Sequence, residues 1–338
     1  MHSLHRARRV GITAIACALL MRLSILEFPE NLLSGLKQSN TDTISTEQET
    51  GRNVRFSSSL DAFSPDFMES PPPVLPEITE VPLPSFSGTE PVKLYYAANI
   101  QPDISALLQK PLQWNLAGEE PSVLILHTHA TESYTQTRQE PYTASSLYRT
   151  LDPQHNMLRV GERVAQVLAE YGIQAIHDRA LHDHPSYSGS YNHARQAMAN
   201  YLEEYPGIRV VLDIHRDALD LSGPEQLCTR AEVDGTPSAQ IMMVVGTDAG
   251  GLYHPQWQEN MAFAVKLHTQ LEKRWPGICR PINFRTERFN QDLSSGALII
   301  EVGANGNTLE EALTAAEALA KGIADLAGGT VTAGSTSS

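Results

Sequence analysis

The chain has 338 residues, and its 25 Lys and Arg against 39 Asp and Glu give a formal net charge of -14. This length allows one large hydrophobic core with appended segments. The acidic balance would repel phosphate backbones and argues against nucleic-acid binding. The three cysteines are too few and too scattered for a disulfide framework or a thiolate zinc cage. Any bound metal would therefore be held by His and carboxylate side chains.

The first segment, residues 1–28, begins with several arginines that precede an apolar run from Val10 to Met21. Positive charge followed by an apolar run is typical of an export signal or a membrane anchor. The run is short for a hydrocarbon core, which needs about 20 apolar residues, but no clear small-x-small cleavage site follows it. We therefore favour a single uncleaved anchor in the cell membrane, with the rest of the chain outside the cytoplasm.

Residues 29–91 are rich in Ser, Thr, Glu and Pro and show no sustained helical or strand periodicity. Such a composition buries too little apolar surface to offset the loss of chain entropy, so we expect a disordered linker. Residues 92–327 carry the periodic segments and form the predicted catalytic domain. Residues 328–338 are expected to be a disordered tail.

Within the predicted domain, short β-branched runs alternate with amphipathic helical segments. This alternation favours an α/β fold, with a mixed, mostly parallel sheet flanked by helices. The predicted strands are Val123–Leu126, Ile173–Ile176, Ile208–Ile214, Ile241–Val245 and Ala297–Val302. The predicted helices are Met157–Tyr171, Tyr191–Tyr205, Trp257–Trp275 and Thr308–Ala327, the first three of which end at Gly or Pro.

Polar residues follow three of these strands directly. The first strand runs into the segment His127–Glu132, the third runs into His215, and the last delivers Glu301. In an open α/β sheet the ligand site lies outside the carboxyl ends of the strands, where the loops converge. We therefore expect these polar groups to meet at one edge of the sheet.

The spacing of His129 and Glu132 allows an imidazole nitrogen and a carboxylate oxygen to bind one cation. With His215 as a third ligand, this makes a His2Glu site for Zn²⁺ that leaves a position open for water. His127 competes with His129, because alternation along an extended strand end would put both imidazoles on one face. The spacing to Glu132 favours His129, and His127 stays open as a ligand or a supporting residue. We expect Asp213 or Asp217 to orient an imidazole.

Glu301 ends a nearly continuous apolar strand, where a carboxylate is costly to bury without a partner. Beside a zinc-bound water it would act as the general base and pass the proton to the leaving nitrogen. The plainer alternative is that Glu301 caps a turn or pairs with Arg285 or Arg288. Likewise, the histidines could merely cap the sheet edge and bond to backbone carbonyls.

Two other segments carry polar residues that could serve a site. The segment His177–His184 offers His and Asp side chains, which suit a second functional loop or a solvated surface. Tyr187 and Tyr191 could line a substrate groove or simply pack, and the polar stretch Arg285–Ser294 could contact substrate. The chain has no Gly-x-Ser-x-Gly elbow, phosphate-binding loop or His-Glu-x-x-His, so serine-hydrolase and nucleotide-dependent activities have no anchor here.

Taken in order, four segments resemble stage II sporulation protein P. These segments are Leu126–Tyr134, Val211–Ala218, Asn290–Ser294 and Ile299–Gly303, and the likeness extends from about Val92 to the end of the last helix. The resemblance implies a fold like that of the zinc N-acetylmuramoyl-L-alanine amidases, with His127 or His129, Glu132 and His215 around the metal and Glu301 as the catalytic carboxylate.

The same resemblance implies a membrane-anchored peptidoglycan hydrolase of sporulation engulfment. Its members cleave the lactyl-amide link and stem-peptide cross-links of peptidoglycan, together with stage II sporulation proteins D and M. A different hypothesis is a metal-free scaffold that binds peptidoglycan and recruits a glycan-cleaving partner. Metal content separates the two hypotheses, because a scaffold would bind sacculi without zinc.

Overall fold

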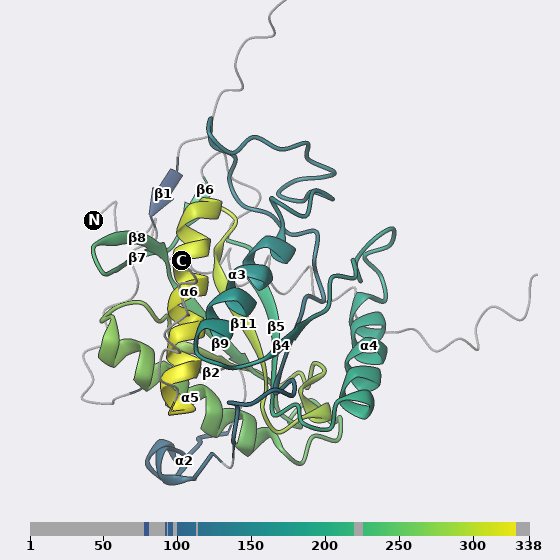
Figure 1. Ribbon diagram of the computed structural model, residues 1–338, viewed down its shortest axis with the longest axis vertical. Coiled ribbons are helices and arrows are strands. Elements are labelled where there is room, and N and C mark those ends of the chain that lie inside the picture. The colour runs from purple at the N-terminus through teal and green to yellow at the C-terminus, as the bar shows by residue number, and fades with distance from the viewer. Residues whose placement is uncertain are drawn as a thin grey trace, which may run out of the picture. The chain divides into compact units, whose positions relative to one another are not determined.

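The computed structural model describes residues 78–80, 92, 94–96, 100–112, 114–219 and 226–328 (Figure 1). The predicted anchor, most of the predicted linker and residues 329–338 of the predicted tail lie outside these ranges. Among the residues that are described, no helix has the length and apolar character needed to cross a bilayer.

A seven-stranded sheet forms the centre of the described region, in the order β2-β10-β9-β11-β5-β3-β4. Its strands are β2 (Leu94–Tyr96), β3 (Val123–Leu126), β4 (Ala175–His177), β5 (Val210–Asp217), β9 (Ile241–Val245), β10 (Ile282–Phe284) and β11 (Ala297–Ala304). All neighbouring pairs are parallel except β9 and β11, which are antiparallel. The prediction of a mixed, mostly parallel sheet is confirmed.

The helices of the described region are α2 (Ile104–Gln109), α3 (Met157–Glu170), α4 (Ser190–Glu204), α5 (Trp257–Arg274) and α6 (Leu309–Leu326), with a 3-10 turn η3 (Gln291–Leu293). Side chains cap three of them, as their sequences favour. Asp103 accepts a hydrogen bond from the Ala106 N–H at the start of α2. Asn156 accepts a hydrogen bond from the Leu158 N–H at the start of α3. Thr308 and Glu311 form a capping box at the start of α6, which satisfies backbone N–H groups that would otherwise lack partners.

The two faces of the sheet carry different helices, because side chains alternate along each strand. On one face, Leu212 and Ile214 of β5 join the main core, which α3, α5 and α6 cover. On the other face, Val211 packs with residues of α4. Figure 1 shows α4 at the right, apart from α5 and α6 at the left. By the same alternation, Asp213 and His215 of β5 lie on the α4 face.

Two small sheets complete the described region: β1 (Ile78–Glu80) with β6 (Gln226–Cys228), and β7 (Arg230–Val233) with β8 (Thr236–Ala239). The strand β1 falls inside the predicted linker, so the expectation of a structureless segment is wrong for these three residues. Their parallel pairing with β6 is a contact between segments far apart in the chain, which local composition does not indicate.

Candidate active site

Three adjacent strands in the middle of the sheet bring the predicted site residues together. His129 follows β3, His215 lies near the end of β5, and Glu301 lies in β11. Glu301 and His215 are register partners on neighbouring parallel strands, so their side chains lie side by side on one face. The expectation that these strand ends share one edge of the sheet is confirmed.

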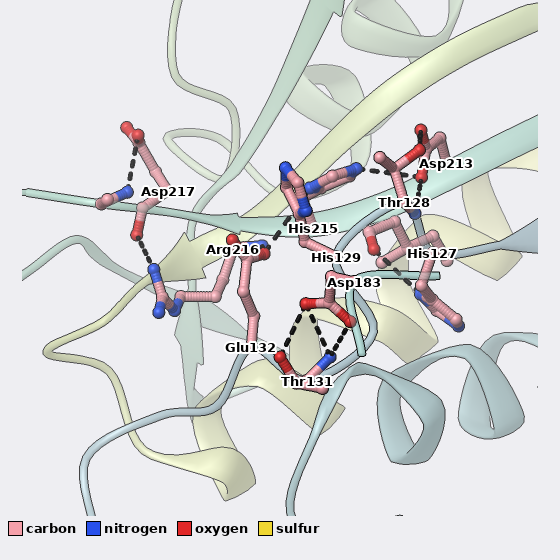
Figure 2. A network of polar contacts seen from close by, with 12 residues as sticks. His127, Thr128, His129, Thr131, Glu132, Asp183, Asp213, His215, Arg216 and Asp217 are labelled. Carbon is pink, nitrogen blue, oxygen red and sulfur yellow. Dashed lines mark hydrogen bonds and ion pairs between the residues drawn. The ribbon is translucent and has the colours of Figure 1, made fainter. Parts of the chain in front are cut away.

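His129, Glu132 and His215 form a tight, buried cluster (Figure 2). The ring centroids of the two histidines are 5.2 Å apart with the rings nearly perpendicular. The Nδ1 atom of His215 lies 3.6 Å from the Oε2 atom of Glu132. The His129 imidazole and the Glu132 carboxylate therefore come from the turn after β3, and the His215 imidazole comes from β5. These two segments are about 80 residues apart in the chain.

Each imidazole is held through its Nε2 atom. His215 Nε2 lies 2.9 Å from Asp213 Oδ1, and because an ionised carboxylate only accepts, this nitrogen donates. His129 Nε2 lies 3.0 Å from the hydroxyl of Tyr187. The Nδ1 atom of His129 is buried and has no hydrogen-bond partner within the described ranges. A metal-ligating histidine commonly donates its other ring N–H to such a neighbour, so Nδ1 is the nitrogen left for a ligand.

This donor set fits a zinc ion in its chemistry. Two imidazoles and one carboxylate are the ligands of a catalytic His2Glu site. The buried Nδ1 of His129 is available as a metal ligand, because it has no hydrogen-bond partner among the described residues. In the part of the chain that is described, no group of three or more His, Cys, Asp or Glu side chains already stands in metal-binding geometry. The residues that could hold the ion are therefore His129, Glu132 and His215.

Charge in this cluster is strongly perturbed. Burial raises the pKa of Glu132, but Arg216, a hydrogen bond to His215 and Arg149 outweigh it, so the pKa is lowered and the carboxylate stays ionised. Burial lowers the pKa of His215, but Asp213 and Glu132 raise it well above its usual value. The carboxylates of Asp213 and Glu132 therefore favour the protonated form of His215.

His127 does not join this cluster. Its Nδ1 atom donates to the carbonyl of Ile214 at 2.9 Å, and its Nε2 atom lies 2.9 Å from Nε2 of His177. The prediction that His127 and His129 share a face is wrong, because β3 ends at Leu126 and the chain turns immediately. His127 keeps the core-facing position, while the turn carries His129 to the α4 face.

The segment after β4 supports the His129 turn. Asp183 accepts hydrogen bonds from the backbone N–H of Thr131 at 3.3 Å and from its hydroxyl at 2.6 Å. In the same segment, His182 Nε2 lies 2.8 Å from Asp178 Oδ2. This segment was predicted as a second functional loop, and the contacts show how it holds the residues around the site. The sequence pattern singled out this segment but did not predict that Asp183 contacts Thr131, which lies 52 positions away.

Aromatic side chains border the site. Tyr187 stacks on His129 with ring centroids 4.4 Å apart, and Tyr191 of α4 meets the same imidazole edge-on at 5.6 Å. Tyr191 also lies 6.0 Å from Phe289. Since Tyr187 is 47% exposed, the predicted aromatic lining reaches solvent beside His129.

The stretch Arg285–Ser294 is tied to the fold at several points. Asp292 receives two hydrogen bonds from Arg195 of α4, at 2.7 and 2.8 Å. The buried amide of Gln291 accepts from Gly246 N–H and donates to the Val244 carbonyl, both at 2.8 Å. Asp292 and Gln291, two of the polar residues that suggested a substrate loop, therefore bond to other parts of the fold. Their contacts hold the stretch that carries Phe289, which lies next to Tyr191.

Asp213, and not Asp217, orients the imidazole of His215. Asp213 also accepts from the backbone N–H and hydroxyl of Thr128, at 2.7 and 2.6 Å, and so links β5 to the turn after β3. Asp217 instead pairs with Arg280 at 2.8 Å. The two aspartates were not separable by sequence, since each lies two residues from His215.

The solved structures that this chain matches include several amidases. N-acetylmuramoyl-L-alanine amidase AmiC2 of Nostoc punctiforme is 16% identical with a TM-score of 0.36, over 62% of this chain and 97% of that chain. N-acetylmuramyl-L-alanine amidase Ami1 from Mycobacterium smegmatis is 18% identical with a TM-score of 0.38, over 64% and 99% of the two chains. The CwlD amidase from Clostridioides difficile is 11% identical with a TM-score of 0.39, over 61% and 98%.

Among curated proteins, stage II sporulation protein P of Bacillus subtilis (strain 168) is 29% identical over 223 residues, which are 63% of this chain and 52% of that protein. The chain thus spans about half the length of this relative. A family model for stage II sporulation protein P matches residues 34–324. This match covers most of the sequence and includes every residue of the candidate site, so the chain belongs to the stage II sporulation protein P family.

Proposed function

We propose that the site hydrolyses amide bonds of peptidoglycan during sporulation, and that its main target is the N-acetylmuramoyl-L-alanine bond. The observation that carries the proposal is the register of Glu301 with His215, beside the unpartnered Nδ1 of His129 and the ionised Glu132. These positions support Glu301 as the proposed general base beside a donor set that suits zinc.

We assign His129, Glu132 and His215 as the ligands of one Zn²⁺ ion, and leave His127 out because both of its ring nitrogens have other partners. When bound, zinc lowers the pKa of a water ligand and polarises a carbonyl group. Asp213 and Tyr187 hold the two imidazoles through Nε2, so each Nδ1 would be available to such an ion.

In the proposed reaction, Glu301 accepts a proton from the attacking water as its oxygen bonds to the amide carbon. The same carboxyl then donates that proton to the leaving nitrogen as the carbon–nitrogen bond breaks. Burial beside His215 keeps bulk water from Glu301, which is 9% exposed. The same chemistry serves stem-peptide cross-links, since these are also amides.

The decisive experiment compares Glu301→Gln, His215→Ala and the parent on purified sacculi, with products identified by mass spectrometry. The exposed Glu310→Gln variant in the first turn of α6 is the matched control. Glu301→Gln should keep one zinc per chain and slow product release by about 10²–10⁴-fold, the usual contribution of a general base. His215→Ala should lose zinc as well as activity.

Two outcomes would reject this function. Product release by Glu301→Gln at the parental rate would show that Glu301 is not the base. A folded parent protein that binds sacculi but holds no zinc would favour the peptidoglycan-binding scaffold. Analysis of defined muropeptides would then separate amidase from endopeptidase products.

We also propose that residues 1–28 anchor the chain in the cell membrane, with the catalytic domain outside the cytoplasm. The charged and apolar start of the sequence supports this, and family membership supports stage II sporulation proteins D and M as partners. Fractionation of cells with external protease treatment tests the location, and co-purification with each protein tests the partners.

A further inference from the structure

Arg149 lies at the centre of the contacts that hold the His129 turn, although it is outside the proposed ligand set. Its backbone segment pairs with that turn: Thr150 N–H donates to the Thr131 carbonyl at 2.8 Å, and Ser133 N–H donates to the Tyr148 carbonyl at 2.9 Å. Glu132 and Arg149 are themselves partners in an isolated β-bridge. This backbone pairing places the side chain of Arg149 next to the His129 turn.

The Arg149 guanidinium contacts Glu132 directly and also contacts residues that hold the His129 turn in place. Nη1 donates to Asp183 Oδ2 at 2.6 Å and to Thr131 Oγ1 at 2.9 Å. Nη2 lies 3.3 Å from Glu132 Oε1. The guanidinium carbon also lies 4.9 Å from the ring centroid of Tyr187, the residue whose hydroxyl meets His129.

This arrangement separates the two oxygens of Glu132. Oε1 faces Arg149, and Oε2 faces Nδ1 of His215 at 3.6 Å. A planar guanidinium can hold one carboxylate oxygen and a second acceptor in fixed directions, whereas an ammonium group cannot. Oε2 also accepts from the Arg216 N–H at 3.4 Å, so Arg149 and Arg216 together hold the carboxylate with Oε2 on the side of His215.

The positive charge of Arg149 would repel a metal ion bound nearby, and Asp183 offsets that charge. Its side chain is 0% exposed and lies 2.6 Å from Arg149, so the buried carboxylate offsets the guanidinium charge. Asp183 also accepts from Thr131, which anchors the pair to the turn itself. The buried ion pair would be costly to break, so it holds a single geometry.

We propose that Arg149, together with Asp183, is a positioning residue that orients Glu132, and through Tyr187 also His129, for metal binding. This inference rests on the proposed function, because it assigns a role toward the proposed zinc ligands. It predicts that metal affinity depends on the guanidinium fork and not only on positive charge.

The test uses the full chain stripped of metal, with Arg149→Lys, Arg149→Met and Asp183→Asn as variants. Arg163→Lys is the control, because Arg163 of α3 also pairs with a carboxylate, that of Glu317, in a more exposed ion pair. Zinc affinity is measured by competition with a chelator. Co²⁺ alone is then bound in place of zinc, because its visible absorption reports the coordination number and symmetry. Thermal unfolding of the metal-free proteins reports fold.

We expect both Arg149 variants to bind zinc about 10–100-fold more weakly, the usual effect of removing a group that orients a ligand, and to change the Co²⁺ spectrum. Asp183→Asn should weaken binding in the same direction, and Arg163→Lys should match the parent. Parental affinity and spectrum in folded Arg149→Lys and Asp183→Asn would overturn the inference alone. A parent that binds neither cation would overturn the proposed function and this inference with it.

Discussion

His127 and His129 are two residues apart, yet their side chains contact opposite sides of the sheet. The His127 ring meets α3, where a Cβ atom on Gly161 would lie 2.5 Å from its Nε2 atom. The His129 ring meets Tyr191 of α4. One imidazole is therefore part of the core and the other part of the site, because the strand ends between them and the chain turns.

This division predicts different consequences for two similar substitutions. His127→Ala removes two buried hydrogen bonds and leaves a cavity, so it should cost the metal-free protein about 2–4 kcal/mol of unfolding free energy. His129→Ala should cost less stability but abolish stoichiometric zinc binding. Urea unfolding and metal analysis of both variants check this. Loss of zinc in a folded His127→Ala protein, with zinc retained in His129→Ala, would reverse the assignment.

Asp213 should control zinc affinity through His215. In Asp213→Asn the amide NH2 cannot accept, so one of the donors on Thr128 or His215 loses its acceptor. We expect zinc affinity to fall by about 10–100-fold, with Asp217→Asn as the control because Asp217 pairs with Arg280 instead. Chelator competition at pH 7.5 measures both. Equal losses in the two variants would mean that the effect is general to this strand.

Local sequence patterns predicted the elements that carry the site. The predicted strands Val123–Leu126 and Ile241–Val245 have the same first and last residues as β3 and β9, because each is a short apolar run between loop residues. The predicted strand Ile173–Ile176 is displaced to Ala175–His177, and the last strand extends to Ala304. Strand ends depend on pairing with neighbours, which a local pattern does not contain.

The contacts between distant segments could not be predicted in this way. The register of Glu301 with His215, the antiparallel entry of β9 and the Arg149–Asp183 ion pair each join residues far apart in the chain. Spacing placed Glu132 near His129, but only the fold shows that Arg149 also faces that carboxylate. A lone arginine in a loop carries no local signal, since most such residues are solvated.

Gly161 should be coupled to His127 in stability. In Gly161→Ala the new Cβ would lie 2.5 Å from His127 Nε2 and 2.6 Å from His177 Nε2, so overpacking should cost about 1–3 kcal/mol. This loss exceeds the gain of about 1 kcal/mol that alanine brings to a helix interior. In a His127→Ser background the contact with His177 remains but the contacts with His127 are gone, so Gly161→Ala should cost less than in the parent.

Urea unfolding of the four proteins in this double-mutant cycle measures the coupling, which should reach at least about 0.5 kcal/mol for residues in contact. Additive effects of the two substitutions would show that the imidazole moves aside at no cost. The cost of Gly161→Ala would then come from the contact with His177.

His254 should make the protein sensitive to acid at a position outside the proposed ligand set. This side chain is 0% exposed, and neither ring nitrogen has a hydrogen-bond partner among the described residues. Burial lowers its pKa from the usual 6.5 in the folded state, so the unfolded chain takes up the proton first. Its contribution to stability is therefore complete above about pH 6.5 and declines as the pH falls below that value.

A His254→Met variant removes this proton uptake and an unsatisfied buried group, and methionine adapts to irregular space. We expect it to be as stable as the parent or more so at pH 7.5, because an unsatisfied buried polar group costs about 1–3 kcal/mol. Its advantage should grow at pH 5.0, as measured by urea unfolding, while the exposed His193→Met serves as the control. An advantage that shrinks between pH 7.5 and 5.0 would mean that His254 gains a partner for its proton, because only a charged imidazole with an acceptor is stabilised by acid.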